Sequence, residues 1–303
     1  MCPLGVWGRP HAAHFSQQVF AVNPLCPSLH FRHPPTPTPN IMPTYLPSFS
    51  LSKKTALVTG AGRGIGKALA IGLAEAGADV AIIARTSADL DAVADEIRKL
   101  GRQCYPVTAD LSQKDAAHQI VDSIVSQLPP GRHIDILINN AGTNIRNKAL
   151  DVTSDEWDTI MSTNLKSAFT LSQSVAAHMK HHNVSGRIIN ISSVAGSVAL
   201  RTGVVYGASK AALDHMTRIL SLEWAPFNIR VNAIGPWYFR TPLTEGVLGD
   251  EKYLGSVLER TPMGRIGEVA ELVGPAVFLA SDASAYVTGQ VLLVDGGMSV
   301  FGF

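Results

Sequence analysis

The 303-residue chain has few cysteines, almost no net charge and no long apolar run. Three cysteines cannot build a disulfide framework, so we expect a reducing intracellular compartment, in the simplest case the cytoplasm. The 25 basic and 24 acidic residues exclude a polybasic nucleic-acid binder and a disordered acidic tail. No stretch approaches the ~20 apolar residues that cross a membrane. The composition therefore predicts a soluble protein that binds neither nucleic acid nor membrane.

Acidic residues are missing altogether from residues 1–50, which instead hold ten of the eighteen prolines. Proline removes backbone donors and fixes φ, so regular helix and interior strand are excluded there. An acid-poor end is also typical of organellar targeting segments, but only Arg9 and Arg32 are basic and the prolines oppose an amphipathic helix. We therefore expect either a disordered N-terminal extension or a translation start site that was assigned upstream of Met42. Organellar targeting is the less favoured alternative.

From Lys54 onward, short apolar runs alternate with longer segments of helical spacing. Short, wholly apolar runs suit strands covered on both faces, and strands alternating with helices imply right-handed crossovers between parallel strands. The expected fold class is α/β, a doubly wound seven-stranded parallel sheet with helices on both faces. The expected strands are Thr55–Val58, Val80–Ala84, Tyr105–Val107, Ile134–Ile138, Arg187–Ile191, Ile229–Ala233 and Val291–Val294. The expected helices are Gly66–Ala76, Ala88–Leu100, Asp115–Gln127, Ser154–His178, Tyr206–Ala225 and Glu268–Ser281.

No Pro-rich or Gly/Ser-rich linker interrupts residues 51–303, so we expect them to form a single domain. Within it, residues 236–265 combine weak periodicity with scattered Gly and Pro. A segment of this kind beside the C-terminal edge of a sheet predicts a lid.

A glycine-rich turn, residues 59–66, joins the first expected strand to the first helix. Gly60 permits a tight turn, Gly64 lets the backbone approach a pyrophosphate, and Gly66 lets the helix pack on the strand. Phosphates would lie at the helix N-terminus, where free N–H groups and the dipole favour negative charge. A plain strand-to-helix turn is the alternative, but the flanking strand and helix favour dinucleotide binding.

The end of the second strand bears on which dinucleotide binds. Folds specific for NAD place a carboxylate there, whereas this chain reads Ala84-Arg85-Thr86. An arginine fork suits a 2′-phosphate, and Arg63 in the glycine-rich turn adds a second positive charge. The alternative is that Arg85 is an ordinary solvated strand end. We therefore expect NADP(H), with NAD(H) as the second possibility.

Tyr206 and Lys210 open a long helical run at a spacing that places both side chains on one face. An adjacent ammonium stabilises phenolate, so we expect Lys210 to lower the pKa of the Tyr206 phenol. Ser193 follows the fifth strand, at the edge of the sheet where doubly wound folds bind ligands. Ser193 could then donate a hydrogen bond to a carbonyl oxygen while Tyr206 delivers a proton.

Taken together, these motifs resemble the short-chain dehydrogenase/reductases of the single-domain branch, with a Rossmann-type fold. The resemblance spans residues 53–300. It is carried by Thr59–Gly66, Asp110, Asn139-Asn140-Ala141-Gly142, Asn164, Ser193, Tyr206 with Lys210, and Val294-Asp295-Gly296-Gly297. Within the family, residues 140–146 and 261–281 resemble sugar-acid dehydrogenases such as gluconate 5-dehydrogenases and 2-deoxy-gluconate 3-dehydrogenases, and similar tails occur in 3-oxoacyl-carrier-protein reductases.

The resemblance implies an NAD(P)-dependent enzyme that transfers hydride between nicotinamide and a secondary alcohol or ketone. It implies Ser193, Tyr206 and Lys210 as catalytic residues and Asn164 as the holder of a relay water. Asp110 would lie near the adenine, Asn140 and Lys210 at the nicotinamide ribose, and Thr241 at the carboxamide. The full implied cofactor set is Gly60, Arg63, Gly64, Ile65, Gly66, Arg85, Asp110, Leu111, Asn140, Ala141, Gly142, Tyr206, Lys210, Pro236 and Thr241.

Two residues bear on the substrate, which we expect to be a small molecule. Arg146 lies four residues beyond Gly142 and could clamp a carboxylate, or else pair with Asp151 or Glu156 as a surface arginine. Trp237 stands where the family usually has Gly, and with its aromatic neighbours it would suit a hydrophobic ketone. A sugar acid and a secondary-metabolite ketone are both open.

The remaining expectations concern an alternative function, the oligomeric state and metal binding. A catalytically idle NADP(H)-binding sensor or scaffold is the alternative function, and an intact Ser/Tyr/Lys set disfavours it. The family suggests a homo-tetramer or homodimer formed through the long helices. His178, His181 and His182 have metal-ligand spacing but no accompanying carboxylate or cysteine, and histidine also suits a helix end, so we expect no metal.

Overall fold

The computed structural model describes residues 45–113 and 115–302, and residues from Tyr45 on form one compact unit. All seven expected strands are present, with ends shifted by at most three residues. They are β1 (Thr55–Thr59), β2 (Asp79–Ala84), β3 (Cys104–Thr108), β4 (Ile136–Asn139), β5 (Gly186–Ile191), β6 (Ile229–Pro236) and β7 (Val291–Val294).

The strands form a single parallel sheet in the order β3-β2-β1-β4-β5-β6-β7. The chain runs outward from β1 to β3, returns to pair β4 with β1, and then runs outward again to β7. The ends of β1 and β4 therefore flank the point at which the strand order reverses, where open α/β sheets bind their ligands.

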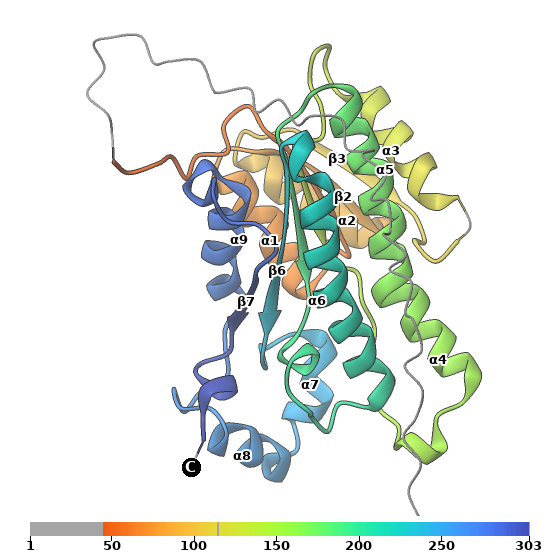
Figure 1. Cartoon of the computed structure of the whole chain (residues 1–303), viewed down its shortest axis with the longest axis vertical. Helices are drawn as coiled ribbons and strands as arrows, with labels where there is room; N and C mark the ends of the chain where they lie inside the picture. The colour runs from red at the N-terminus through yellow and green to blue at the C-terminus, as the bar shows by residue number, and fades with distance from the viewer. Residues whose placement is uncertain (1–44, 114, 303) are drawn as a thin grey trace, which may run out of the picture. The chain divides into compact units, whose positions relative to one another are not determined.

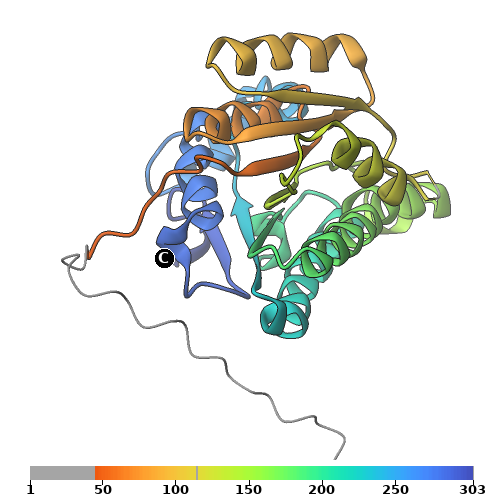
Figure 2. The same ribbon diagram turned by 90° about the horizontal axis from the view of Figure 1, so that it is seen from above.

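Helices cover both faces of the sheet (Figures 1 and 2). They are α1 (Gly64–Glu75), α2 (Ser87–Lys99), α3 (Ala116–Gln127), α4 (Ser154–Met161), α5 (Ser167–His181), α6 (Val204–Trp224), α7 (Pro242–Leu248), α8 (Glu251–Glu259) and α9 (Val273–Ala280). One core contains Leu69, Leu90 and Leu279, from α1, α2 and α9, while the other contains Ile120, Leu171 and Leu220, from α3, α5 and α6. The doubly wound parallel α/β fold is thus confirmed.

Two expected helices are interrupted. Residues 154–178 form α4 and α5, separated by a π-helical turn, η2 (Ser162–Lys166), and the segment expected at 268–281 begins with a 3-10 turn before α9. The apolar pattern continues through the π turn, so periodicity alone does not reveal the break. Short 3-10 turns complete the structure: η1 (Ala149–Asp151), η3 (Val194–Gly196), η4 (Ala225–Phe227), η5 (Val269–Leu272), η6 (Asp282–Ser284) and η7 (Met298–Val300).

The segment 236–265, expected as a lid, contains α7 and α8, which lie at the end of the sheet where β6 ends (Figure 1). Thr241 caps the N-terminus of α7 and Asp250 that of α8, which explains how helices form despite the weak periodicity. The segment has an apolar cluster of its own, built on Tyr238 and Val257 together with Ile266, which directly follows the segment. It is therefore a small packed unit standing over the C-terminal edge of the sheet.

The expected N-terminal extension, residues 1–50, lies outside the described residues up to Thr44. Residues 45–50, which are described, are exposed and form neither helix nor strand. Within the part of the chain that the structure describes, no helix is both long and apolar enough to span a membrane.

Candidate active site

Four candidate catalytic residues meet where β5 ends and α6 begins. Ser193 is the second residue after β5, and its Oγ accepts a hydrogen bond of 3.1 Å from the backbone N–H of Ala195. Tyr206 and Lys210 lie in the first two turns of α6. Asn164 reaches the same helix, because its Nδ2 donates to Ser209 Oγ at 3.2 Å. The structure thus brings together all four residues that the resemblance implied.

Lys210 is buried, with 5% of its surface exposed. Its Nζ donates a hydrogen bond of 2.8 Å to the carbonyl of Ile191 at the end of β5. Burial lowers the pKa of Lys210 to about 8, an effect that the Asp214 carboxylate opposes. An amine with this pKa changes its charge close to neutral pH, whereas an exposed lysine stays protonated.

The expectation that Lys210 lowers the pKa of Tyr206 is wrong for this structure. Burial raises the pKa of the Tyr206 phenol, and only the hydroxyl of Ser193 and the charge of Arg146 oppose that rise. The reason is geometric: the ammonium is tied to Ile191 and lies 5.7 Å from the centroid of the Tyr206 ring. The phenol is therefore held in its protonated form, which is the form that can donate a proton.

Asn164 occupies the π-helical turn between α4 and α5, and 1% of its surface is exposed. Its side chain spans the loop after β4, because Oδ1 accepts from the N–H of Thr143 at 2.8 Å and Nδ2 donates to the Thr143 carbonyl at 2.9 Å. Single π-helical turns occur often at functional sites, because the extra residue redirects backbone groups. The break in the helix thus places Asn164 against α6.

Asp214 is a buried residue of the site that sequence reasoning missed. It lies one turn after Lys210 on α6, with 2% of its surface exposed, and neither carboxylate oxygen has a hydrogen-bond partner among the described residues. Burial raises its pKa, against the lowering effects of Ser192, Arg218 and Lys210. The spacing of four from Lys210 is the signal that could have revealed it.

The glycine-rich turn has the shape that a pyrophosphate needs. Gly60 and Gly64 have φ of +63° and +57°, in the left-handed region that favours glycine. A Cβ on Gly66 would lie 2.2 Å from the carbonyl oxygen of Gly60, so any side chain there would collide with the turn. The N-terminus of α1 has no side-chain cap and no acidic residue in its first turn. Its free N–H groups, beginning at Gly64 and Ile65, fit an anionic ligand.

The loop after β4 braces this turn. Asn140 Nδ2 donates to the carbonyls of Thr59 and Gly60 at 2.9 and 3.3 Å, and the N–H groups of Asn140 and Ala141 donate to Thr59 Oγ1. The amide hydrogens of Asn140 are therefore directed at the turn, and its contact with a ribose stays a prediction. A Cβ on Gly142 would lie 3.4 Å from Asn164 Oδ1 and 3.8 Å from Lys210 Nζ, so glycine keeps this approach open.

Arg85 and Arg63 are exposed at the edge expected for the adenosine end of a dinucleotide. Arg85 follows β2 directly, and Arg63 is the N-terminal flanking residue of α1. The hydrogen bonds from Ser112 lower the pKa of Asp110, and the charge of Arg85 adds to that lowering. Both arginines thus border the expected adenosine site, while Leu111 packs against the second core.

Thr241 caps α7 and faces the glycine-rich turn, since a Cβ on Gly64 would lie 3.6 Å from Thr241 Cβ.

Pro236 ends β6 beside Val294. Trp237 Nε1 donates to Thr261 Oγ1 at 3.1 Å, and Trp237 lines a small cavity that it shares with Thr261 and Val294. Pro236 and Trp237 therefore shape the base of the lid, and none of the four candidate catalytic residues lines that cavity.

Arg146 is held by the lid rather than by a carboxylate. Its guanidinium donates to the hydroxyls of Tyr253 and Tyr238 at 3.0 and 3.3 Å, and these two hydroxyls lie 2.6 Å apart. None of the ion pairs within residues 45–113 and 115–302 includes Arg146. The alternative that it pairs with Asp151 or Glu156 is thus not what the structure shows.

Comparison with known proteins extends this picture. The family model described as enoyl-(acyl carrier protein) reductase matches residues 60–299. The chain is 44% identical to a tropinone reductase homolog from Arabidopsis thaliana over 255 residues, which cover 84% of this chain and 96% of the relative. It is 42% identical to the gluconate 5-dehydrogenase of Gluconobacter oxydans over 253 residues, or 83% of this chain and 97% of the relative.

Among solved structures, a gluconate 5-dehydrogenase from Burkholderia cenocepacia in complex with NADP and tartrate matches with a TM-score of 0.80 at 38% identity. The match covers 84% of this chain and 98% of that one. Similarity of this extent defines the class: an NAD(P)-dependent oxidoreductase that acts on CH–OH groups. The chain belongs to the short-chain dehydrogenase/reductase family. The resemblance read from the sequence is confirmed, and the NADP-bound neighbour agrees with NADP(H) as the favoured cofactor.

The low pKa of Lys210 predicts how stability depends on pH. Between about pH 8 and 10.5 the unfolded chain holds a proton on this amine that the folded chain lacks, so the free energy of unfolding should rise with pH there. Urea unfolding should show this rise in wild type and not in Lys210→Met, with a difference of about 3 kcal/mol at most. Lys252→Met, an exposed position on α8, should behave as wild type. Parallel pH profiles for wild type and Lys210→Met would show that Lys210 keeps its ordinary pKa.

Proposed function

We propose that the protein is an NADP(H)-dependent oxidoreductase that interconverts a secondary alcohol and a ketone on a small substrate with a carboxylate, of the sugar-acid class. The observation that carries the reaction is the meeting of Ser193, Tyr206 and Lys210 where β5 ends and α6 begins. The observation that carries the substrate class is the guanidinium of Arg146, held over the same region by two lid tyrosines.

When bound, a nicotinamide cofactor supplies or accepts the hydride. The chain's own residues act on the substrate oxygen. The hydroxyl of Ser193 donates a hydrogen bond to that oxygen, and the phenol of Tyr206 gives it a proton in the reductive direction. Burial keeps the pKa of Tyr206 raised, so the proton is present at neutral pH and moves only as negative charge develops.

Lys210 and Asn164 act through Tyr206 rather than on the substrate oxygen. The tie of Lys210 to Ile191 holds the amine 5.7 Å from the centroid of the Tyr206 ring, so Lys210 positions the start of α6, which carries Tyr206, rather than setting the pKa of the phenol. Hydrogen bonds to Thr143 and Ser209 fix Asn164, which is the residue proposed to hold a relay water. Protons then return to Tyr206 from the interior side of the site.

Arg85 and Arg63 support the preference for NADP(H). Both are exposed, and within residues 45–113 and 115–302 neither belongs to an ion pair. No carboxylate follows β2, where NAD-specific folds place one. Two unneutralised guanidinium groups favour a 2′-phosphate, which a carboxylate at this place would repel.

Arg146 supports a carboxylate on the substrate. Its positive charge opposes the rise that burial causes in the pKa of Tyr206. Burial raises the pKa of Tyr238 to about 12, so its phenol stays neutral and holds the guanidinium without cancelling its charge. A solved relative carries tartrate, a hydroxy acid, together with NADP. Arg146 can thus bind a carboxylate in bidentate fashion while the adjoining hydroxyl carbon faces Tyr206.

A hydrophobic ketone is supported less well. Tyr238 and Phe239 are buried within the lid and its neighbouring core, with 6% and 4% of their surfaces exposed. The indole N–H of Trp237 donates to Thr261 Oγ1 within the lid. The aromatic run therefore forms the body of the lid, and an apolar substrate would leave the charge of Arg146 without a partner.

The proposal also includes the expected domain organisation, oligomeric state and cellular location. Residues 51–303 act as one dinucleotide-binding oxidoreductase domain, with residues 1–50 as an extension. Exposed apolar side chains lie on the long helices, among them Trp157 on α4, Phe169 on α5 and Leu222 on α6, and they support a homodimer or homo-tetramer. The cytoplasm remains the proposed location.

Replacement of the phenol tests the enzyme against an idle NADP(H)-binding sensor. Wild type should oxidise NADPH with at least one sugar-acid ketone, and Tyr206→Phe should lose about 10³-fold or more in turnover, because it lacks the proton donor. NADP⁺ affinity should stay within about twofold of wild type. Tyr105→Phe, on β3, is the matched control and should keep full activity. Cofactor binding without turnover on any sugar acid, polyol, thioester or ketone would instead favour the sensor.

Arg85→Ala tests cofactor choice. Loss of a charge-assisted contact with a 2′-phosphate should raise the KM for NADPH by about 10- to 100-fold and leave the KM for NADH nearly unchanged. Arg98→Ala, an exposed arginine on α2 paired with Asp95, is the control and should change neither value. Equal effects on both cofactors would contradict a role in 2′-phosphate recognition.

Arg146→Gln tests the substrate class. For an acid substrate, KM should rise by about tenfold or more, since one charge-assisted contact is lost, while the KM for NADPH stays unchanged. The corresponding methyl ester or polyol should show no such penalty. Lys148→Gln, an exposed cation in the same loop, is the control. An equal loss on charged and uncharged substrates would assign Arg146 to lid structure alone.

A further inference from the structure

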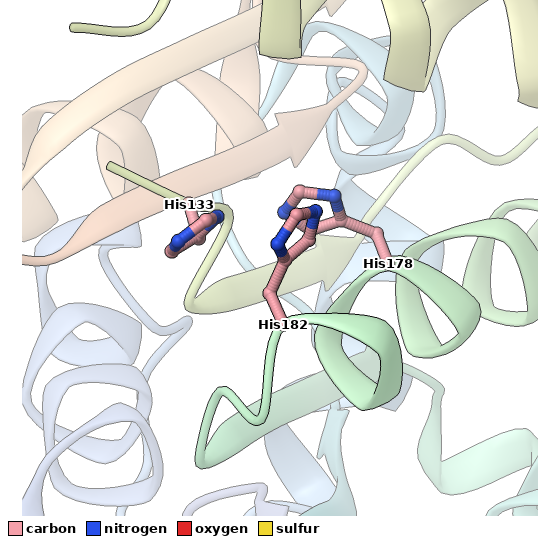
Figure 3. Close-up of side chains that lie close together, drawn as sticks. All are labelled: His133, His178 and His182. Carbon is pink, nitrogen blue, oxygen red and sulfur yellow. The ribbon is translucent and has the colours of Figure 1, made fainter. Parts of the chain in front are cut away.

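Three histidines meet at the edge of the sheet opposite the candidate active site. His178 lies in the last turn of α5, His182 follows directly after that helix, and His133 comes from the loop that leads into β4 (Figure 3). Ser193 follows the end of β5, whereas His133 precedes the start of β4, and these strands are parallel neighbours. The histidines therefore take no part in the chemistry described above.

The backbone holds the three residues in place. The N–H of His182 still donates to the carbonyl of His178 at 3.1 Å, so the two rings emerge one helical turn apart on one face. His133 lies between Arg132, which pairs with Asp79 at 2.9 Å, and the fully buried Ile134. The N–H of Ile134 also donates to His178 Nε2 at 3.4 Å, a long hydrogen bond that joins the loop to the helix and that a metal ion bound to His178 would replace.

The side chains converge on one another. One ring nitrogen from each histidine lies within 4.8 Å of those from the other two, and the centroids of His133 and His182 are 4.4 Å apart. Zinc binds imidazole nitrogen at about 2.0 Å, which places tetrahedral ligands about 3.3 Å from each other. Metal binding would therefore draw the rings closer together, and His182, which is exposed, is the one least restrained by packing.

The surroundings favour a cation bound by nitrogen. Asp135, the nearest carboxylate in sequence, is occupied by Lys54 Nζ at 3.1 Å and by the N–H of Thr55 at 2.9 Å. Three imidazoles without a carboxylate suit zinc and its transition-metal neighbours rather than magnesium or calcium.

We propose that His133, His178 and His182 bind a divalent transition-metal ion, Zn²⁺ in the first instance, with water as the fourth ligand. The ion would link the loop before β4 to the end of α5. Because the metal binds the folded chain, its main effect is to stabilise the fold rather than to change the reaction. The expectation from sequence that no metal binds here depended on His178, His181 and His182 alone and did not include His133.

Zinc binding by the full-length, untagged protein tests the proposal. After chelator treatment, Zn²⁺ is titrated by calorimetry, and the thermal midpoint is recorded with and without the ion. The variants are His133→Asn and His182→Asn, whose side chains are not in the buried core. His181→Asn and His215→Asn, both exposed, are matched controls. Histidines and cysteines in residues 1–44 are common to all five proteins, so their contribution cancels in the comparison.

Wild type and both controls should bind one more Zn²⁺ than His133→Asn and His182→Asn, or bind it about tenfold or more tightly. Zinc should raise the thermal midpoint of wild type and controls more than that of the two variants. When Co²⁺ replaces Zn²⁺, wild type and both controls should show the visible absorption bands of a four-coordinate cobalt site. His133→Asn and His182→Asn should lack these bands. NADPH oxidation should be equal in all five proteins, so this test stands apart from the proposed function.

Equal zinc stoichiometry, affinity and thermal shift in wild type, His133→Asn and His182→Asn would overturn the proposal. A loss in His181→Asn as large as that in His182→Asn would also overturn the assigned set of ligands. Zinc binding by wild type only at millimolar concentrations would also overturn the proposal, because surface histidines on any protein bind the ion that weakly.

Discussion

The arrangement of the candidate active site depends on one buried charge, the ammonium of Lys210 held against the carbonyl of Ile191. A buried ammonium is costly unless hydrogen bonds satisfy it, and the carbonyl at the end of β5 meets part of that need. The same contact fixes α6 against the end of the strand, and α6 carries Tyr206. Asp214, one turn further along, places a second ionisable group in the same interior and shifts the balance of charge around Lys210.

The opposite side of the site is made by loops whose polar groups are almost all committed to one another. Asn140 braces the glycine-rich turn, Asn164 spans the loop after β4, and the lid tyrosines hold Arg146. Since these contacts join segments that follow β1, β4 and β6, the site is assembled only when the sheet is complete. Among the groups left with open hydrogen-bonding capacity is the N-terminus of α1, which has no side-chain cap.

Much of this follows from local sequence patterns. The seven strands, the glycine-rich turn and the Tyr206–Lys210 spacing are each determined by residues close together in the chain, so periodicity and motif suffice to find them. The π turn at Ser162–Lys166 does not follow in this way, because an extra residue in a helix leaves the apolar pattern almost unchanged. The pKa of Tyr206 also escaped prediction, since burial and the direction of the Lys210 amine decide it.

The sequence by itself determined the fold class, the family and the identity of the candidate catalytic residues, because each is written in short-range spacing around the ends of strands. Only the tertiary structure decided what those residues touch. It pairs Arg146 with two tyrosines about a hundred residues away, and it brings His133 to a helix that begins more than thirty residues later. Contacts between distant segments depend on how layers pack, and no local pattern contains that information.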